Sequence, residues 1–252
     1  MKLTQTWQRA KRSLPAMIVL ASFLTLTMAG TATAGAMSRP VVVELYTSEG
    51  CSSCPPAEKL LEELAKRTDV LALAFHVDYW DDLGWRDHFS MQEATQRQQE
   101  AARTLKLKTV GTPQFIVDGR TALWGTGRES LEQALKARRP DVAVEMTRTD
   151  SNLIVRAEAP GSAERYDVYV VGYLPEAVTA IGRGENAGRT LREVNAVRYI
   201  RKIGSSGDAT REWSFPFDKL PKDAERIAVL LQSPTTGAIV GARSVARNSL
   251  TP

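Results

Sequence analysis

Residues 41–54 read VVVELYTSEGCSSC. The first six are apolar or β-branched apart from one glutamate, which is typical of a buried strand, and a turn-forming segment follows. The chain's two cysteines, Cys51 and Cys54, come next. After them Pro55 and Pro56 open a stretch with helical periodicity, because proline is tolerated in the first turn of a helix. The stretch therefore predicts a strand, a C-x-x-C turn and a helix in direct succession.

A C-x-x-C pair at the start of a helix has a mechanism for disulfide exchange. The positive end of the helix dipole and the free backbone N–H groups favour a thiolate, which is the attacking species. We therefore expect Cys51 to attack, Cys54 to resolve the mixed disulfide, and Cys51 to be the more exposed of the two. The alternative is a stable disulfide without turnover, which exported proteins hold routinely.

A proline that follows a glycine turn marks a second candidate feature. Thr112-Pro113 lies directly before an extended apolar segment, so its peptide bond is a candidate for the cis form; an ordinary trans turn is the alternative. Residues 115–117 and 121–124 flank Asp118-Gly119, a pair that suits a type I′ turn. We expect a hairpin that Thr112-Pro113 opens.

The chain changes character near Pro140. Before it, apolar runs at 41–46 and 70–77 surround the first helix and predict a parallel βαβ unit. Two more helices are expected, at 90–105 with Ser90 as the N-cap residue, and at 128–138, where Pro140 ends the helix. This half reads as an α/β domain over residues 37–140.

The second half, residues 141–252, reads as a β-rich domain. Short strand candidates recur at the spacing of a β-sandwich. They lie at 142–146, 153–157, 166–173, 194–203, 211–217, 227–232 and 238–245. We therefore expect an α/β domain, a mixed sheet with flanking helices, followed by an all-β sandwich-like domain.

These motifs carry a resemblance to known families. With CSSC at 51–54 and GTP at 111–113 in this order, the chain resembles the thioredoxin superfamily. With FHVDYW at 75–80 and GENAGRTL at 184–191 as well, it resembles the secreted proteins of the domain-of-unknown-function 1223 family. The resemblance implies a thioredoxin-like domain in which Thr112 and Pro113 lie against the C-x-x-C, but it brings no activity.

Some residues depart from a typical thioredoxin. Glu49 and Gly50 precede Cys51, where redox-active relatives often carry tryptophan, and the inner pair of the motif is Ser-Ser. Glu44 lies one residue upstream of the buried carboxylate that moves protons in many thioredoxins. We expect it either to assist proton transfer or to be a paired polar residue on a buried strand. The direction of redox chemistry stays open.

A group of histidines and aspartates follows the second strand and is a candidate metal site. Its members are His76, Asp78, Asp81, Asp82 and His88. With Cys51, Cys54 and His76 together, a Cu(I) site like that of copper-delivery thioredoxin folds is conceivable. Spacing alone does not show that the ligands converge, and a solvated acidic loop is favoured.

The N-terminus resembles a secretory signal peptide over residues 1–36. Basic residues precede the apolar stretch 16–29, and small residues fit cleavage near Ala34 or Ala36. The stretch is shorter than the ~20 residues of a spanning helix, so no membrane span is expected after cleavage. Four of the 33 Lys and Arg residues lie in this segment. Its removal leaves 29 basic and 29 acidic residues, so the mature chain is formally neutral. Its charge therefore gives no argument for nucleic acid binding.

Together these features predict a thiol-disulfide oxidoreductase that is periplasmic or secreted. Its partners would be protein thiols or disulfides, or a redox partner protein, and its only redox group the disulfide itself. A binding module with a structural disulfide and a copper carrier are the alternatives. A dinucleotide site at residues 182–188 is disfavoured, since the loop is one residue too long for G-x-G-x-x-G and lacks a strand-to-helix setting.

Overall fold

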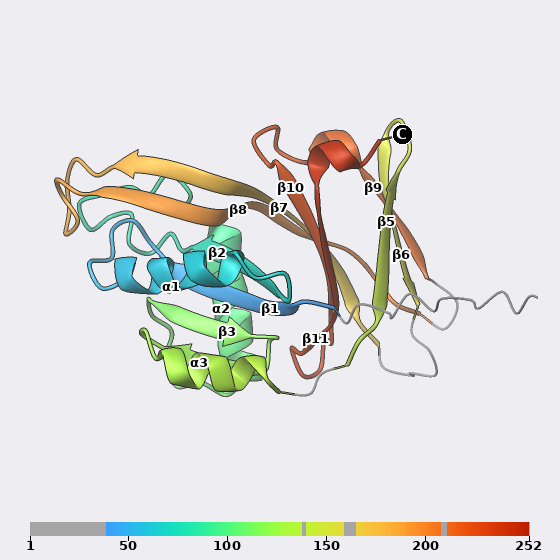
Figure 1. Cartoon of the computed structure of the whole chain (residues 1–252), viewed down its shortest axis with the longest axis horizontal. Coiled ribbons are helices and arrows are strands. Elements are labelled where there is room, and N and C mark those ends of the chain that lie inside the picture. The colour runs from blue at the N-terminus through green and yellow to red at the C-terminus, as the bar shows by residue number, and fades with distance from the viewer. Residues whose placement is uncertain (1–38, 138–139, 159–164, 208–210, 252) are drawn as a thin grey trace, which may run out of the picture. The chain divides into compact units, whose positions relative to one another are not determined.

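The computed structural model describes residues 39–251 except 138–139, 159–164 and 208–210 (Figure 1). The expected signal peptide, with cleavage near Ala34 or Ala36, lies outside the described residues. Among the described helices none is long and apolar enough to cross a membrane.

The predicted βαβ unit is present. Strand β1 (Val41–Thr47) leads through helix α1 (Pro55–Ala65) to β2 (Val70–His76), and the two strands pair in parallel, with Val41 opposite Val70. Every residue of β1 is buried, because β1 lies between two other strands and both of its faces are covered. This explains the continuous apolar run in the sequence.

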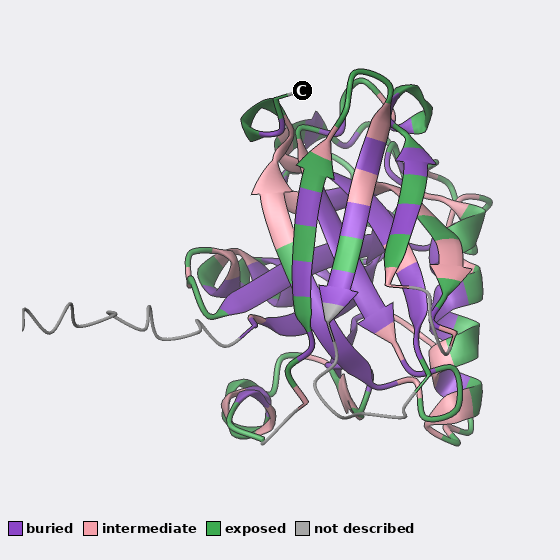
Figure 2. Cartoon of the chain, turned by 90° about the vertical axis from the view of Figure 1, so that its right-hand side faces the viewer, coloured by how far each residue is buried: buried purple, intermediate pink, exposed green. Residues whose placement is uncertain are grey.

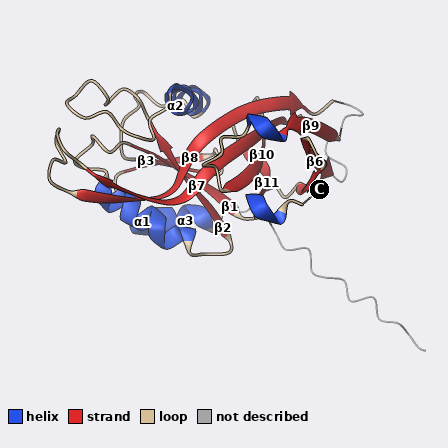
Figure 3. Ribbon diagram, turned by 90° about the horizontal axis from the view of Figure 1, so that it is seen from above, coloured by secondary structure: helices blue, strands red, loops and turns tan. Residues whose placement is uncertain are grey.

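The helices cover both faces of this part of the sheet (Figure 3). Helices α1 and α3 (Arg128–Leu135) pack on one face, and α2 (Gln92–Thr104) packs on the other. Helix α2 begins two residues later than predicted, since the Ser90 hydroxyl donates to the Asp81 carboxylate (2.7 Å) instead of capping the helix.

The predicted hairpin is strands β3 (Gln114–Val117) and β4 (Thr121–Trp124). Asp118 and Gly119 both have positive φ, as a type I′ turn requires. Strand β3 pairs antiparallel with β1, with Gln114 opposite Tyr46. The hairpin therefore starts beside the carboxyl end of β1, where the C-x-x-C motif follows.

The second half of the chain differs from the predicted separate sandwich. Four of its strands continue the sheet of the first half, and the eight-stranded order is β11-β10-β7-β8-β2-β1-β3-β4. The added strands are β7 (Asp167–Ala180), β8 (Thr190–Ser205), β10 (Arg226–Gln232) and β11 (Ile239–Ala246). Residues on both sides of Pro140 thus share one sheet.

The join between the two halves is short. Strand β8 runs parallel to β2 with Ala196 opposite Ala74, and the Asn195 side chain donates to the Ala72 carbonyl (2.8 Å). Asn195 has φ 52, a left-handed conformation that asparagine tolerates better than most residues. Beyond this point β7 and β8 continue as a long hairpin past the C-terminal end of β2 (Figure 1).

The remaining strands form a second, three-stranded sheet in the order β5-β6-β9. They are β5 (Ala143–Arg148), β6 (Asn152–Glu158) and β9 (Glu212–Pro216), and two short 3₁₀ helices follow at Phe217–Lys219 and Arg247–Ser249. Buried and exposed residues alternate along β5 and β9 (Figure 2), because one face packs on β7, β10 and β11. A sandwich-like packing of two sheets is thus present, but one of them is the shared sheet.

The expected domain boundary near Pro140 therefore does not separate two cores. One apolar cluster joins Val42 and Phe75 of the first half to Val171, Leu230 and Ile239 of the second. Residues Ser38–Pro252 cluster as one compact unit. The sequence pattern did not reveal the shared sheet, because strands of both halves have the same patterns of apolar residues, either alternating with polar ones or in continuous runs.

A buried ion pair fastens the two halves at the start of β1. The Arg39 guanidinium donates twice to the Asp118 carboxylate (2.8 and 3.1 Å) and once to the Ile239 carbonyl of β11 (2.7 Å). Asp118 also accepts from the Val42 N–H (2.9 Å). Removing one partner of such a pair leaves an uncompensated buried charge.

We predict that Arg39→Gln destabilises the fold of residues 39–251 by about 3–5 kcal/mol, because it removes the cation that compensates the buried Asp118 carboxylate. The midpoints of urea unfolding, measured by fluorescence and by circular dichroism, should shift by the same amount. Arg67→Gln is the matched control, since Arg67 is about a third exposed beside Asp69 and Glu132 and should cost less than about 1 kcal/mol. Unfolding of the two halves in separate transitions would contradict the shared core.

Candidate functional site

Cys51 and Cys54 form a disulfide between β1 and α1, with their Cα atoms 5.4 Å apart. Cys54 is the residue before the helix, and its N–H donates to the Cys51 carbonyl (3.2 Å). Both cysteines are 0% exposed. The prediction that Cys51 is the more exposed is therefore wrong for the oxidised state.

The loop between β7 and β8 covers the disulfide. The Asn186 side chain is fully buried there, and its amide donates to the carbonyls of Glu49 (2.9 Å) and Cys51 (3.0 Å). The Ser52 N–H donates to the Glu185 carboxylate (3.2 Å). We call residues 182–189 the cover loop, because it satisfies backbone groups of the C-x-x-C turn from outside.

The cover loop rests on the loop that follows β2. Gly184 has φ +78, and a Cβ at this position would lie 3.0 Å from Trp85 Cβ. Glycine is therefore required both by the left-handed backbone and by the close approach. Trp85 in turn donates from its indole to Glu49 (2.8 Å), so the two loops and the C-x-x-C turn brace one another.

The Thr112–Pro113 peptide bond is cis, as predicted. Pro113 is buried and directly precedes Gln114, which lies opposite Tyr46 near the end of β1. Trp80 connects this turn to the C-x-x-C segment: its indole N–H donates to the Thr112 hydroxyl (2.9 Å), and its Cβ lies against Gly50. An aromatic side chain from another loop thus packs on Gly50.

A buried cluster of ionisable groups lies at the same end of the sheet. It consists of Glu58 of α1, His76 of β2, Asp87 of the following loop and Glu193 of β8, all less than a tenth exposed. Burial, and to a smaller extent the Glu193 carboxylate, raise the pKa of Glu58 to about 8, although a hydrogen bond from Thr47 (2.6 Å) opposes the rise. Glu58 is one helical turn after Cys54, so both lie on the buried face of α1.

His76 carries the positive charge of this cluster. Burial alone would lower its pKa, but Asp87 at 2.8 Å and Glu193 at 3.4 Å raise the pKa well above its usual value. Burial likewise opposes ionisation of Asp87, but the His76 charge outweighs it and lowers the pKa of Asp87. The cluster therefore holds a charged His76–Asp87 pair beside a Glu58 that is mostly protonated at neutral pH.

Glu44 lies in a different environment from the one that we expected. Its side chain accepts a hydrogen bond from Arg97 of α2, and both residues line a pocket on the α2 face of the sheet. Neither cysteine lines that pocket. The second of our two readings, a paired polar residue on a buried strand, describes Glu44 correctly.

The candidate metal ligands do not converge. Both ring nitrogens of His76 face carboxylates, Asp78 accepts from Thr95, and His88 contacts Glu49. Asp81 binds the Asp87 N–H and the Ser90 hydroxyl. Within the described residues, no group of three or more His, Cys, Asp or Glu side chains is arranged to hold a metal ion. These residues brace an acidic loop.

Four residues of the site were not named in the sequence analysis: Glu58, Asp87, Asn186 and Glu193. Glu58 had a local signal, because a residue four positions after Cys54 on a helix shares its face. Glu193 and Asn186 had none, since they lie more than 130 positions from the cysteines and reach them only through the pairing of β8 with β2.

The comparisons with known proteins agree with this description at the level of family and fold. The family model described as a protein of unknown function, DUF1223, matches residues 42–232. The crystal structure of protein AGR_C_4864 from Agrobacterium tumefaciens is 29% identical with a TM-score of 0.73, and the match covers 85% of this chain and 97% of that one. HBP35 of Porphyromonas gingivalis is 15% identical with a TM-score of 0.60, covering 85% and 77%, which shows a shared fold alone. A search of curated proteins found no match.

We predict that Glu58 makes the oxidised protein less stable as pH rises. Its folded pKa of about 8 exceeds the ordinary value of 4.5, so between these values the folded state binds more protons than the unfolded state. Its stabilising contribution is complete below about pH 4.5 and is lost as pH rises through 8, with a slope of at most about 1.4 kcal/mol per pH unit. Urea unfolding of the wild type and Glu58→Gln from pH 5 to 9 measures how the free energy of unfolding changes with pH.

The glutamine variant should lose this part of the slope, because glutamine resembles the protonated acid. His76 contributes in the same direction in both proteins, so the difference between the two curves isolates Glu58. Glu63→Gln, on the same helix and paired with Arg128 in solvent, should keep the wild-type slope. Parallel curves for the wild type and Glu58→Gln would refute the raised pKa.

Proposed function

The chain belongs to the DUF1223 family of proteins of unknown function, and we propose that it is a thioredoxin-like thiol-disulfide oxidoreductase that acts through Cys51 and Cys54. The parallel βαβ unit, the C-x-x-C turn before α1 and the cis Thr112–Pro113 bond at the start of β3 support this assignment. They stand in the chain order that the resemblance stated for the sequence implies.

The observation that carries the proposal is the position of Glu58, a buried acid one helical turn after Cys54 on the buried face of α1. A disulfide with a purely structural role has no use for a buried acid whose pKa of about 8 lies close to that of a free thiol. Breaking a disulfide by exchange produces a leaving thiolate that must gain a proton, and forming one requires that a thiol lose it. Perturbed acids of this kind concentrate at reactive sites.

In the proposed reaction a substrate thiolate attacks the sulfur of Cys51. The Cys51–Cys54 bond breaks, and Cys54 leaves as a thiolate that takes the proton of Glu58. A second substrate thiolate then attacks the mixed disulfide and releases Cys51, so the substrate is oxidised by two electrons and this protein is reduced. In reverse, the Glu58 carboxylate takes the proton of Cys54, which then resolves the mixed disulfide at Cys51.

Substrate access requires the cover loop to move. The amide of Asn186 and the side chain of Glu185 hold the C-x-x-C turn with three hydrogen bonds in the oxidised state. Opening breaks these bonds and frees the Cys51 carbonyl. An extended substrate segment beside Thr112 and Pro113 would then pair with backbone groups, the usual way in which a strand is added to a sheet edge.

Complete burial of both cysteines favours a second candidate, a binding module with a structural disulfide. In that case the cover loop stays closed and the cysteines do not exchange. The copper-carrier alternative would require His76 to leave Asp87 and Glu193, its partners on both ring nitrogens.

The signal-like N-terminus supports a periplasmic or secreted location for this activity. The partners would be protein thiols or disulfides, or a protein that restores the redox state of Cys51 and Cys54. A disulfide can persist in such a compartment, and exchange enzymes work there.

We predict that the reduction potential of the Cys51–Cys54 disulfide lies above about −300 mV, as for exchange-active disulfides. Equilibration with glutathione and thioredoxin buffers measures it. In Cys54→Ala, exposed to periplasmic or secreted proteins with reducible disulfides, Cys51 should be trapped in mixed disulfides, and Cys51→Ala serves as the control. A potential below about −300 mV together with no trapped species would establish the structural role instead.

We predict that Asn186→Ala speeds reduction of the disulfide by dithiothreitol by roughly tenfold or more, because two hydrogen bonds that close the cover loop are lost. Arg183→Ala, an exposed change in the same loop, should leave the rate unchanged. Stopped-flow fluorescence follows the reaction. Equal rates for all three proteins would show that the cover loop does not limit access.

A further inference from the structure

The sulfur of Cys51 accepts a hydrogen bond from the side chain of Ser53. The distance from Ser53 Oγ to Cys51 Sγ is 3.3 Å, and Ser53 is the donor because a disulfide sulfur carries no proton. Within the described residues no other hydrogen bond reaches either sulfur of the disulfide. Ser53 is exposed although Cys51 is fully buried, so its hydroxyl joins the sulfur to the surface.

The usual donors of a helix N-terminus are not available to Cys51. Pro55 and Pro56 occupy the first two positions of α1, and proline has no N–H group. The next two N–H groups of the helix donate to the Cys54 carbonyl (2.8 and 3.1 Å). The free backbone donors that were expected to favour a thiolate at this helix end are therefore missing or occupied.

Three N–H groups of the turn also have partners. The N–H of Cys51 donates to the Ser48 carbonyl (3.1 Å), and that of Cys54 donates to the Cys51 carbonyl (3.2 Å). The Ser52 N–H donates to the Glu185 carboxylate (3.2 Å). This last contact brings a negative charge to the turn, which disfavours a thiolate nearby.

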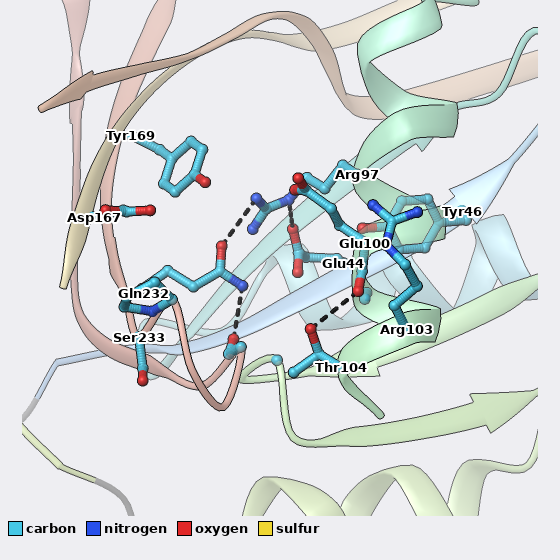
Figure 4. Close-up of a pocket in the computed structure, with 14 residues that line it drawn as sticks. Glu44, Tyr46, Arg97, Glu100, Arg103, Thr104, Asp167, Tyr169, Gln232 and Ser233 are labelled. Atoms are coloured by element: carbon cyan, nitrogen blue, oxygen red, sulfur yellow. Dashed lines mark hydrogen bonds and ion pairs between the residues drawn. The ribbon is translucent and has the colours of Figure 1, made fainter. Parts of the chain in front are cut away.

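Cations of the site are held by other groups. Both ring nitrogens of His76 face carboxylates, and Arg189 of the cover loop donates to the Asn186 side chain (3.0 Å). The buried Arg97 pairs with Glu44 in the pocket on the α2 face, which neither cysteine lines (Figure 4). The Ser53 hydroxyl is thus the side-chain donor that the fold directs at Cys51.

We propose that Ser53 is a catalytic residue whose hydroxyl stabilises the thiolate of Cys51, an inference that rests on the proposed disulfide exchange. When the second substrate thiolate attacks the substrate sulfur of the mixed disulfide, the bond to Cys51 Sγ breaks and the electron pair stays on Cys51. The Ser53 O–H donates to this charge and keeps its proton. A hydrogen bond to an ionised acceptor is stronger than one to a neutral acceptor, so the contact gains strength as the thiolate forms.

Ser53 and Glu58 then act on different sulfurs. Glu58 lies on the buried face of α1 and exchanges a proton with Cys54, whereas the exposed Ser53 holds Cys51 as an anion. This division agrees with the roles proposed for the cysteines. Cys51 must be a thiolate in order to attack, and Cys54 must be able to gain and lose a proton.

The test is the titration of Cys51 in the Cys54→Ala chain, where Cys51 is the only thiol. The ultraviolet absorbance of the thiolate follows this titration without requiring solvent access. Adding Ser53→Ala should raise the pKa of Cys51 by roughly one unit, because the hydrogen bond to the charged form is lost. The pH midpoint of the reaction of Cys51 with hydroxyethyl disulfide should move upward by the same amount.

Ser52→Ala in the same chain is the matched control, since Ser52 contacts Glu185 of the cover loop instead of a sulfur. It should move the titration by less than about a third of the Ser53→Ala shift. The surrounding charged groups are unchanged in both variants, so they cancel in the comparison; they are Glu49, Glu58, His76, Asp87, Glu185, Arg189 and Glu193. Circular dichroism should show the same fold for both, because both serines are exposed.

An unchanged pKa of Cys51 in Ser53→Ala would overturn the proposal, and so would an equal shift in Ser52→Ala. The titration measures the contact between Ser53 and Cys51 without any protein substrate. It therefore decides on Ser53 separately from the trapping experiment, whose failure would overturn the proposed exchange function instead.

Discussion

The short parallel pairing of β8 with β2 is the constraint on which the rest of the structure depends. A register of Ala196 opposite Ala74, with the Asn195 amide on the Ala72 carbonyl, joins two strands more than a hundred residues apart. From it follow the continuous eight-stranded sheet, the placement of Glu193 beside His76, and the projection of the β7–β8 hairpin over Cys51. The second half of the chain thus completes both the core and the site of the first.

The buried ionisable cluster is the costly part of this arrangement. Three carboxylates and one imidazole are withdrawn from water, and the charged pair of His76 and Asp87 offsets only one of the negative charges. The raised pKa of Glu58 means that this acid keeps its proton at neutral pH, which avoids the free-energy cost of burying another negative charge. Apolar side chains of the same volume are often at least as stabilising as a buried ionic cluster, so the cluster agrees with the role proposed for Glu58 in disulfide exchange.

The local features of the fold could be predicted from the sequence, whereas those that depend on distant contacts could not. Strand β1, the helix after Cys54, the Asp118-Gly119 turn and the cis bond at Pro113 all follow from residues that adjoin one another. The sequence left two readings of Glu44 open, a proton carrier or a paired polar residue, because its partner, Arg97, lies 53 positions away on α2. The domain boundary at Pro140 failed for the same physical reason: a strand's sequence records how buried it is, but not which strand lies beside it.

In the proposed reaction, the cover loop couples access to the disulfide with binding of the substrate backbone. Asn186 donates to the carbonyls of Glu49 and Cys51, groups that lose this partner when the loop opens. Unpaired carbonyls are unfavourable, so the open state is populated to the extent that water or a substrate backbone replaces the amide. A small reductant offers no such replacement, whereas an extended polypeptide carries N–H groups at regular intervals. In the proposed reaction the cover loop would therefore favour polypeptide substrates over small reductants without contacting either.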